Sequence, residues 1–327
     1  MGRHSQRLVR GRRVVKRLPV FLPMRNCPNR CIYCDQVTIT GYSGSPSPEE
    51  VRVEASKNVE PLEVCFFGGS FTCQPMDLQR QYLSAAASAP AGSRIRLSTH
   101  PLCITSEVLS LLSEYPVRSI ELGVSSLDDG VLKRCNRGYS ERVALEKISL
   151  IANGPGNIPG AQLMTGLPCQ DENSSMKDLL LLRDLKGHGK MELRIYPCLV
   201  LRGTPLEGLF LSGQYIPPGV DESARWAGRM VRYATRNGFD ILRVGLQETP
   251  SLMQGVVAGP HHPALGELAR SFAMVLSLLE ENPTGPWIAD QRQRSLLAGH
   301  GCWGFRELER LSGLDPKRAR DLVTWTG

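Results

Sequence analysis

Three cysteines lie close together near the start of the chain, at Cys27, Cys31 and Cys34. Three residues separate the first pair and two separate the second, so one loop can direct all three thiolates at a soft metal centre. Structural zinc usually takes four ligands, commonly from two such cysteine pairs, and the sequence has no second pair of this kind. An iron–sulfur cubane also takes four cysteines in most proteins, so three would leave one iron open to a small molecule. The spacing therefore indicates a cluster with one open iron, and zinc is the competing interpretation.

Cysteines are also common as small buried side chains. However, Pro28, Asn29 and Arg30 make the segment between the first two cysteines polar and prone to turn, which is not typical of a core strand. The apolar segment 19–24 directly before the loop predicts a short strand, and the next helix is expected only much later in the chain. The sequence therefore predicts a strand that leads into a cysteine loop.

With Tyr33 before its last cysteine, this loop resembles the Cys-x3-Cys-x2-Cys signature of the radical S-adenosylmethionine (SAM) superfamily. The resemblance implies a [4Fe–4S] cluster held by Cys27, Cys31 and Cys34, with SAM bound at the open iron and Tyr33 packed beside the adenine. It also implies an activity, in which one electron from the cluster cleaves SAM to a 5′-deoxyadenosyl radical that abstracts hydrogen from a substrate. The electron would come from a reductant such as flavodoxin or ferredoxin. The resemblance names no catalytic residue for this chain.

A glycine pair follows the second apolar run of the chain, within Gly68-Gly69-Ser70-Phe71-Thr72. Glycines let the backbone approach a ligand closely and adopt positive φ, although a plain tight turn is the alternative interpretation. In the radical SAM superfamily the corresponding loop binds the methionyl amino group of SAM. The resemblance therefore assigns Gly68, Gly69 and Ser70 to SAM binding, with Ser70 standing where many members carry Glu.

Three polar residues at the ends of later strands are further candidates for SAM binding: Glu121, Ser125 and Gln162. The resemblance implies that they contact the amino acid part and the ribose hydroxyls, and ordinary residues at a barrel mouth are the alternative. Arg194 and Arg202, near the end of the sixth expected strand, are candidates for a phosphate or carboxylate of the substrate. Structural ion pairs are the alternative role for these two arginines.

Apolar strands alternate with helical segments from residue 19 onwards, which predicts a parallel sheet covered by helices. Six strands are expected at residues 19–24, 62–67, 94–98, 117–124, 162–165 and 192–196. Helices are expected from Pro48 and at residues 76–88, 105–113, 127–134, 140–152 and 174–186. A helix at 220–237 and a strand at 241–246 follow, and then helices at 264–281, 305–312 and 316–324.

The predicted fold is α/β, a partial (β/α)6 TIM-like barrel of the radical SAM type with a small α-rich C-terminal extension. Its predicted domains are a basic arm at residues 1–18, the core barrel at 19–246 and the extension at 247–327. In barrels of this kind, the working residues lie where the strands end. The cysteine loop and the glycine pair both follow predicted strands.

Further motifs narrow the resemblance to a subgroup. Phe66-Phe-Gly-Gly-Ser-Phe-Thr72, Glu121-Leu-Gly-Val-Ser-Ser126, Arg137-Gly-Tyr139 and Arg194-Ile-Tyr-Pro197 occur in this order. Together they resemble the radical SAM domain of the Elongator catalytic subunit and its bacterial relatives, and more distantly the oxygen-independent coproporphyrinogen oxidases. Ser125 stands where the subgroup usually has Gln, so the substrate does not follow from the resemblance. The residues after the barrel are too few for the Elongator acetyltransferase domain, and acetyl-CoA chemistry is not expected of this chain.

The 327 residues carry a formal net charge of +7, which originates in the first 17 residues. A basic arm on a neutral body favours contact with RNA phosphates, and a solvated tail is the alternative. No apolar run is long enough for a membrane span, and the cysteine content together with an iron–sulfur site implies a reducing cytoplasm. The cysteines outside the loop are expected to be small buried side chains: Cys65, Cys73, Cys103, Cys135, Cys169, Cys198 and Cys302.

The predicted function is that of a radical SAM enzyme acting on a tRNA base, with tRNA as the partner of the basic arm. An unpaired base suits a deep pocket, because bases must leave the stack to be modified. A radical SAM enzyme acting on a small metabolite is one alternative. A non-catalytic relative that binds a cluster and a tetrapyrrole is another.

Overall fold

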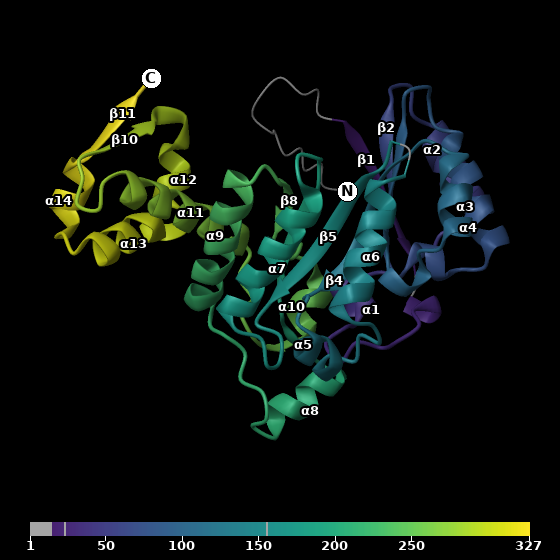
Figure 1. Ribbon diagram of the computed structural model, residues 1–327, viewed down its shortest axis with the longest axis horizontal. Coiled ribbons are helices and arrows are strands. Elements are labelled where there is room, and N and C mark those ends of the chain that lie inside the picture. Colours follow the sequence, from purple (N-terminus) through teal and green to yellow (C-terminus); the bar gives the residue numbers. More distant parts are fainter. Residues whose placement is uncertain (1–14, 23, 155) are drawn as a thin grey trace. The chain divides into compact units, whose positions relative to one another are not determined.

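A parallel sheet of seven strands is the largest element of the fold (Figure 1). The structure, a computed structural model, describes residues 15–22, 24–154 and 156–327. In spatial order the strands are β1 (Lys16–Leu22), β2 (Leu62–Gly68), β3 (Arg94–Thr99), β4 (Val117–Ser125), β5 (Ile158–Thr165), β6 (Glu192–Pro197) and β8 (Asp240–Val244). The predicted α/β fold with a parallel sheet is confirmed, and the strand expected at 241–246 joins the six others in this sheet.

Helices follow the strands along the chain, as the alternating pattern predicts. They are α1 (Gln36–Thr40), α2 (Pro48–Ser56), α3 (Met76–Ala87), α4 (Ser106–Ser113), α5 (Asp129–Arg134), α6 (Glu141–Ala152), α7 (Glu172–Lys186), α8 (Pro205–Leu211), α9 (Val220–Arg236) and α10 (Pro250–Gly255). The expected helix start at Pro48 is confirmed, because the Ser47 hydroxyl accepts from the Glu50 amide and the Glu50 carboxylate accepts from the Ser47 amide. In the described part of the chain, no helix has both the length and the apolar character that crossing a bilayer requires.

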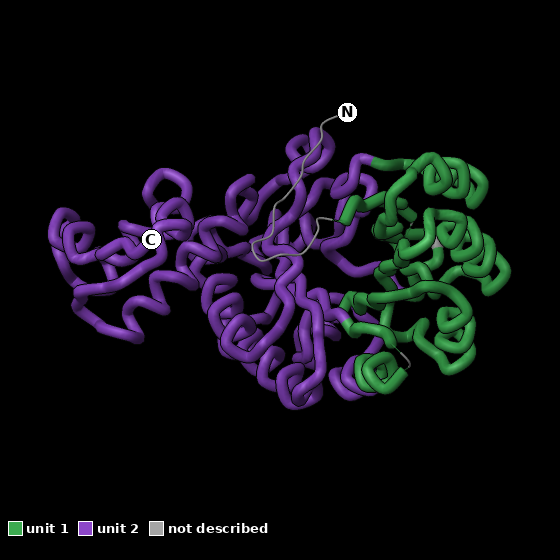
Figure 2. Tube along the Cα trace, turned by 90° about the horizontal axis from the view of Figure 1, so that it is seen from above, with its two compact units in different colours: residues 1–28, 42–123, 147–159 green, residues 29–41, 124–146, 160–327 purple. Residues whose placement is uncertain are grey.

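The internal contacts divide the chain into two compact units (Figure 2). The first comprises the described parts of residues 1–28, 42–123 and 147–159, and the second comprises residues 29–41, 124–146 and 160–327. The division falls within the cysteine loop, so Cys27 belongs to the first unit and Cys31 and Cys34 belong to the second.

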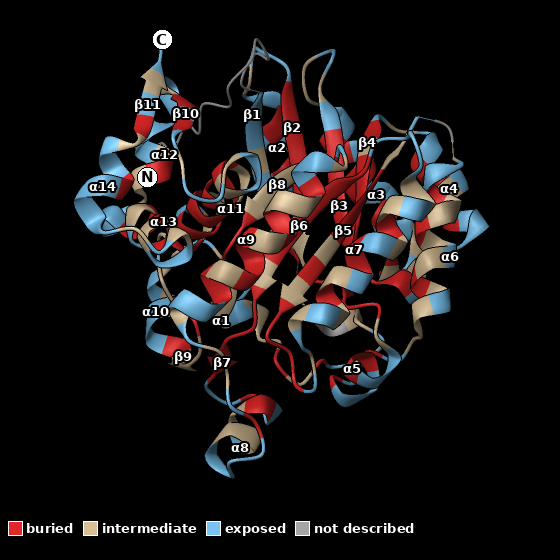
Figure 3. Ribbon diagram, turned by 60° about the vertical axis from the view of Figure 1, so that its left-hand side comes forward, coloured by how far each residue is buried: buried red, intermediate tan, exposed pale blue. Residues whose placement is uncertain are grey.

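The core of the first unit is built on the strands β1 to β3. Val64 of β2 pairs with Ile95 of β3, and both side chains are buried, as the continuous apolar run of β2 predicts for a covered parallel sheet. The Phe66 ring packs against the Phe71 ring with 4.7 Å between their centroids. Figure 3 shows buried residues along β2 and β3 and exposed residues on the outer sides of the helices.

The first unit also buries three charged side chains on neighbouring strands. Arg96 of β3 donates to Glu63 of β2 over 3.2 Å and to Glu121 of β4 over 3.0 Å. Burying a charge is costly unless it is paired, and here two carboxylates share one guanidinium that keeps its proton. These ion pairs link three adjacent strands of the unit.

In the second unit, α9 packs along α11 (Leu265–Glu281). Gly228 permits this close approach, because a Cβ atom there would lie 2.8 Å from the Ala269 carbonyl oxygen. Beyond α11 the chain continues through β10 (Trp287–Asp290), α12 (Arg294–Ala298), α13 (Trp303–Ser312), α14 (Pro316–Asp321) and β11 (Val323–Thr326). A hydrophobic cluster that includes Trp287 and Leu308 holds these elements together.

The helix predicted at 316–324 is too long. It ends at Asp321, and the residues Val323–Thr326 form a strand that pairs in parallel with β10. The sequence Val-Thr-Trp-Thr favours this outcome, because β-branched and aromatic side chains fit a pleated surface. Two further short strands, β7 (Val200–Leu201) and β9 (Val256–Ala258), pair with each other in an antiparallel manner.

The prediction that all the remaining cysteines are small buried side chains is wrong for four of them. Cys73 and Cys103 form a disulfide in the first unit, with 5.1 Å between their Cα atoms. They lie in the short 3-10 helices Phe71–Cys73 and Pro101–Cys103, which follow the adjacent strands β2 and β3 and thereby bring the two cysteines together. Cys169 and Cys302 are exposed, whereas Cys65, Cys135 and Cys198 are buried as expected.

A buried carboxylate of the second unit holds the loop that follows β4. Asp178 of α7 accepts from the Leu127 amide over 2.9 Å and from the Ser126 hydroxyl over 3.0 Å. Burial raises the pKa of Asp178 to about 7, although both hydrogen bonds oppose this rise. The carboxylate therefore positions the loop directly after Ser125 at a cost that depends on pH.

We expect this cost to be measurable. The folded chain holds the Asp178 proton to a higher pH than the unfolded chain, so the free energy of unfolding falls as pH rises between about 4 and about 7. Between pH 5 and pH 8, Asp178→Asn should gain about 2–3 kcal/mol of stability relative to wild type, as measured by urea unfolding. Asp184→Asn on the same helix is the control, because its carboxylate is 66% exposed. Equal pH slopes for wild type and Asp178→Asn would contradict the expectation.

Candidate metal and cofactor site

The cysteine loop lies between a short 3-10 turn and a short helix. The turn Met24–Asn26 precedes Cys27, whose amide donates to the Met24 carbonyl over 3.0 Å. A second turn joins Cys34 to Cys31, whose carbonyl accepts from the Cys34 amide over 3.2 Å. Helix α1 then begins directly at Gln36, capped by the Asp35 carboxylate. The expectation of a helix only much later in the chain is therefore wrong, because Asp35 is a favourable helix cap.

In the first unit, the glycine pair and Ser70 lie beside the first cysteine. The Ser70 hydroxyl is 3.2 Å from the Cys27 sulfur, and the Gly69 amide donates to the Leu22 carbonyl over 2.8 Å. Gly68 has φ +92°, and a Cβ atom there would come within 2.6 Å of the Leu22 oxygen. Only glycine satisfies both conditions, so this loop is built by close backbone contact with the end of β1.

In the second unit, a buried arginine contacts the second cysteine. The Arg137 Nη1 atom is 2.6 Å from the Cys31 sulfur, and both residues are buried. The guanidinium also donates to the Tyr139 hydroxyl from Nε over 3.0 Å and from Nη2 over 2.9 Å, and that hydroxyl donates to the Val124 carbonyl over 2.7 Å. A guanidinium keeps its charge in proteins, so a cation lies directly against the Cys31 sulfur.

The segment 135–139 packs closely on the cysteine loop. The Ile32 amide donates to the Cys135 carbonyl over 3.3 Å, and the Asn136 side-chain amide donates to the Arg30 carbonyl over 2.9 Å. Gly138 has φ +75°, and a Cβ atom there would lie 2.3 Å from the Asn29 side-chain oxygen. Glycine at this position therefore allows Arg137 to reach the cysteine.

Arg137 is the residue of this site that the sequence did not reveal. The motif Arg137-Gly-Tyr139 supported the resemblance, but its residues received no role. The available signal was the order of residue types, an arginine directly before a glycine. The glycine after Arg137 lets the backbone turn with positive φ and pass close to the cysteine loop, and this places the arginine beside the sulfur. The pairing itself joins positions 106 residues apart, which no local pattern indicates.

Tyr33 and Ser125, two of the predicted SAM-binding residues, contact each other. The Tyr33 hydroxyl lies 2.6 Å from the Ser125 hydroxyl, and both residues are buried. Burial raises the pKa of Tyr33 well above its ordinary value, so the phenol is neutral at physiological pH. Ser125 has φ 64°, a left-handed conformation that is uncommon for a residue other than glycine and is often found at functional sites.

Two buried cysteines near Cys31 are poor metal ligands. Cys135 and Cys198 belong to the same hydrophobic cluster as Cys31 and Tyr33. Burial raises the pKa of each of these two thiols to about 12, so both remain protonated. Because thiolates rather than thiols bind metals, Cys135 and Cys198 are not candidate ligands.

The donor set of the loop fits an iron–sulfur cluster. Each of the three loop sulfurs has a polar neighbour, since Cys34 accepts from the Gln36 side-chain amide over 3.5 Å and the other two contact Ser70 and Arg137. Hydrogen bonds to the sulfurs are one of the levers that set the potential of such clusters. Within residues 15–22, 24–154 and 156–327, however, no three cysteine, histidine or acidic side chains are gathered so that they could hold a metal ion. The assignment of Cys27, Cys31 and Cys34 as ligands therefore stays a prediction.

Glu121 and Gln162 also stay predictions as SAM contacts. Glu121 is buried in its ion pair with Arg96, so it serves the structure of the first unit. Gln162 of β5 is paired in register with Arg194 of β6 in the second unit, and its side chain is half-buried.

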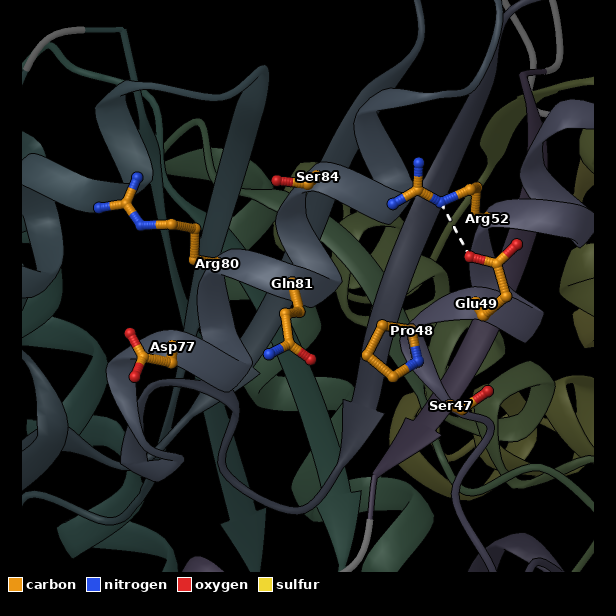
Figure 4. A pocket seen from close by; sticks show the side chains of 8 residues that line it. All are labelled: Ser47, Pro48, Glu49, Arg52, Asp77, Arg80, Gln81 and Ser84. Atoms are coloured by element: carbon orange, nitrogen blue, oxygen red, sulfur yellow. Dashed lines mark ion pairs between the residues drawn. The ribbon is translucent and has the colours of Figure 1, made fainter.

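A hollow of about 720 Å³ lies on the surface of α2 and α3 in the first unit (Figure 4). Its two arginines are already paired, Arg52 with Glu49 over 3.2 Å and Arg80 with Glu114 over 2.7 Å. None of the predicted site residues lines this hollow. It therefore contributes nothing to the candidate site.

Comparison with known proteins identifies two family domains in the chain. A model of the radical SAM superfamily matches residues 21–179, and a model of the Radical_SAM C-terminal domain matches residues 191–273. Elongator complex protein 3 of Drosophila melanogaster is 28% identical over 196 residues, which cover 52% of this chain and 35% of the relative. The tRNA uridine(34) acetyltransferase of Dehalococcoides mccartyi is 26% identical over 235 residues, which cover 58% of this chain and 50% of the relative. Among the first curated relatives, the share of their length that the chain spans ranges from 32% to 66%.

Two solved structures have a similar fold. Elp3 of the archaeon Methanocaldococcus infernus matches with a TM-score of 0.58 at 18% identity, covering 82% of this chain and 63% of that chain. The coproporphyrinogen III oxidase HemN of Escherichia coli matches with a TM-score of 0.52 at 16% identity, covering 68% of this chain and 53% of that chain. The predicted resemblances to the Elongator catalytic subunit and, more distantly, to coproporphyrinogen oxidases are therefore confirmed. The cysteine loop, its fold and the two matching domains show that the chain belongs to the radical SAM superfamily, whose enzymes use a [4Fe–4S] cluster and SAM.

Proposed function

We propose that this chain is a radical SAM enzyme that abstracts hydrogen from a base of tRNA. The observation that carries the proposal is the environment of the cysteine loop, in which a buried guanidinium and two further polar groups face the three sulfurs. A loop built only to fill a core is lined by apolar groups, whereas here a charged group and two polar groups lie against the sulfurs.

In this proposal Cys27, Cys31 and Cys34 hold the cluster, and Gly68, Gly69 and Ser70 bind the amino acid part of SAM. When bound, the cluster and SAM supply the 5′-deoxyadenosyl radical. The chain's own residues orient the cofactors and exclude water, as the burial of Tyr33 and Arg137 favours. A reductant such as flavodoxin or ferredoxin, and a location in the cytoplasm, are part of the proposal.

tRNA is the proposed substrate for two reasons. One relative acts on tRNA uridine 34 by its name, and the N-terminal arm is basic. The arm as far as residue 14 lies outside the described residues. Of its other two cations, Arg17 pairs with Glu63 over 3.1 Å and the Lys16 ammonium donates to the Asn58 side chain. Phosphate contacts of the arm itself are therefore assigned to its earlier arginines.

The first test is an anaerobic assay of the full chain with a reconstituted, reduced cluster. With SAM and bulk bacterial tRNA, wild type should form 5′-deoxyadenosine faster than with SAM alone, and Cys31→Ala should lose at least about 100-fold of the rate because it loses a ligand. Mass spectrometry of the nucleoside product is the measurement, and Cys169→Ala is the control because Cys169 is exposed and free. Cleavage that tRNA does not stimulate would contradict the substrate and favour a small metabolite. No cleavage from an intact, reducible cluster would contradict the enzyme itself.

A second prediction concerns Arg137. The reduced cluster carries one more negative charge than the oxidised one, so a nearby cation stabilises the reduced form. Arg137→Met should therefore lower the midpoint potential by about 50–100 mV, as expected for the loss of one buried charge-assisted hydrogen bond. Redox titration followed by electron paramagnetic resonance, with iron content measured in parallel, checks this.

Arg134→Met is the matched control, because Arg134 is an exposed arginine of the neighbouring α5. It should leave the potential unchanged. An intact cluster with the wild-type potential in Arg137→Met would refute the assigned role. Arg137→Lys should recover part of the shift, since it restores the charge without the planar fork.

A further inference from the structure

Three arginines of the second unit lie on one side of the edge strand β8. Arg194 of β6 and Arg243 of β8 are register partners in parallel strands, so their side chains leave the same face of the sheet. The third, Arg270, lies on α11, and the start of this helix packs on the end of β8. Gly266 makes this contact possible, because a Cβ atom there would lie 2.4 Å from the Val244 oxygen.

The backbone fixes the guanidinium groups of Arg243 and Arg270 near each other. Arg243 donates from Nε to the Gly245 carbonyl over 2.9 Å, and Arg270 donates from Nη1 to the Gly266 carbonyl over 3.3 Å. The two glycines are themselves in contact, since a Cβ atom on Gly245 would lie 3.5 Å from the Gly266 amide nitrogen. Each guanidinium uses one of its five N–H donors in these bonds, and the other donors are available.

Arg243 and Arg270 carry positive charges that no described carboxylate balances. Burial lowers the pKa of Arg243, and Arg194 lowers it further, with only Tyr196 opposing. Burial and then Arg243 lower the pKa of Arg270. In the part of the chain that the structure describes, no carboxylate acts on either guanidinium. Arg194 already has a partner of its own, so only Arg243 and Arg270 are candidates for binding an anion.

We propose that Arg243 and Arg270 form a phosphate-binding subsite for the substrate. Two partly buried cations held side by side repel each other, and a protein retains such an arrangement at a cost unless an anion joins it. Both side chains are partly exposed, so a ligand can reach them.

The chemistry and the position of the cluster favour a phosphate. Two planar guanidinium forks can donate to several oxygens of one phosphate, whereas a carboxylate offers only two oxygens and a single charge. Arg243 is followed by the last residue of β8, and in barrels of this kind the ligands bind at the carboxyl ends of the strands. The assignment of this phosphate to RNA rests on the proposed function. The binding of a phosphate to the two arginines is independent of that function.

Binding to the full chain tests the subsite directly. Inorganic phosphate and adenosine monophosphate should bind wild type in calorimetry and raise its melting temperature at constant ionic strength, and acetate should do neither. Arg243→Met and Arg270→Met should each weaken phosphate binding at least tenfold. Arg236→Met is the matched control, because it removes an arginine of the neighbouring α9 that is 60% exposed, and it should bind phosphate like wild type.

The result separates a ligand role from a structural role. If the two arginines only support the fold, their removal lowers the melting temperature by the same amount with and without phosphate, and the proposal is overturned. Wild-type phosphate binding by both variants, or acetate binding as tight as phosphate binding, also overturns it. A dinucleotide that competes with phosphate identifies an RNA phosphate as the ligand, and competition by the monophosphate alone identifies a free phosphate ester.

The subsite and the proposed function can fail separately. Loss of phosphate binding in both variants, together with SAM cleavage that tRNA does not stimulate, would leave the subsite in place and exclude the tRNA substrate. Stimulation by tRNA together with wild-type phosphate binding in both variants would support the tRNA substrate and exclude the subsite.

Discussion

The contact between the Arg137 guanidinium and the Cys31 sulfur is the constraint on which the rest of the candidate site depends. Burying a cation is costly unless it is paired, and the Arg137 guanidinium contacts the Cys31 sulfur and the Tyr139 hydroxyl. The same arginine fixes Tyr139, which in turn holds the backbone at Val124, so one charge orders two loops of the second unit.

Arg96 of the first unit and the pair Arg243 and Arg270 of the second unit differ in how their charges are compensated. In the first unit, Arg96 lies between Glu63 and Glu121, so the burial of its charge is compensated within the fold. In the second unit, Arg243 lowers the pKa of Arg270, and no described carboxylate acts on either guanidinium. Glu121 was expected to bind SAM, yet it belongs to the compensated group. The uncompensated arginines of the second unit are the better candidates for a ligand.

The sequence predicted those features that depend on near neighbours in the chain. The strand β2 follows from a short apolar run, and the cysteine loop follows from spacing within eight residues. Features formed by distant residues could not be predicted in this way. The Cys73–Cys103 disulfide depends on two short 3-10 turns that end adjacent strands, and neither turn has a strong sequence pattern. Arg243 and Arg270 meet only because α11 packs at the end of β8.

Ser125 illustrates how one small residue can alter a site without altering the fold. The Elongator subgroup usually carries Gln at this position, whereas here a short hydroxyl lies 2.6 Å from the Tyr33 hydroxyl. A longer side chain at Ser125 would occupy the volume that Tyr33 uses for this hydrogen bond, so one of the two would have to move. The left-handed backbone at Ser125 and the Asp178 hydrogen bonds to the following residues maintain this arrangement at some cost in stability. Tyr33 is part of the cysteine loop, so the hydrogen bond with Ser125 also positions that loop. The resemblance implies that SAM binds next to Tyr33.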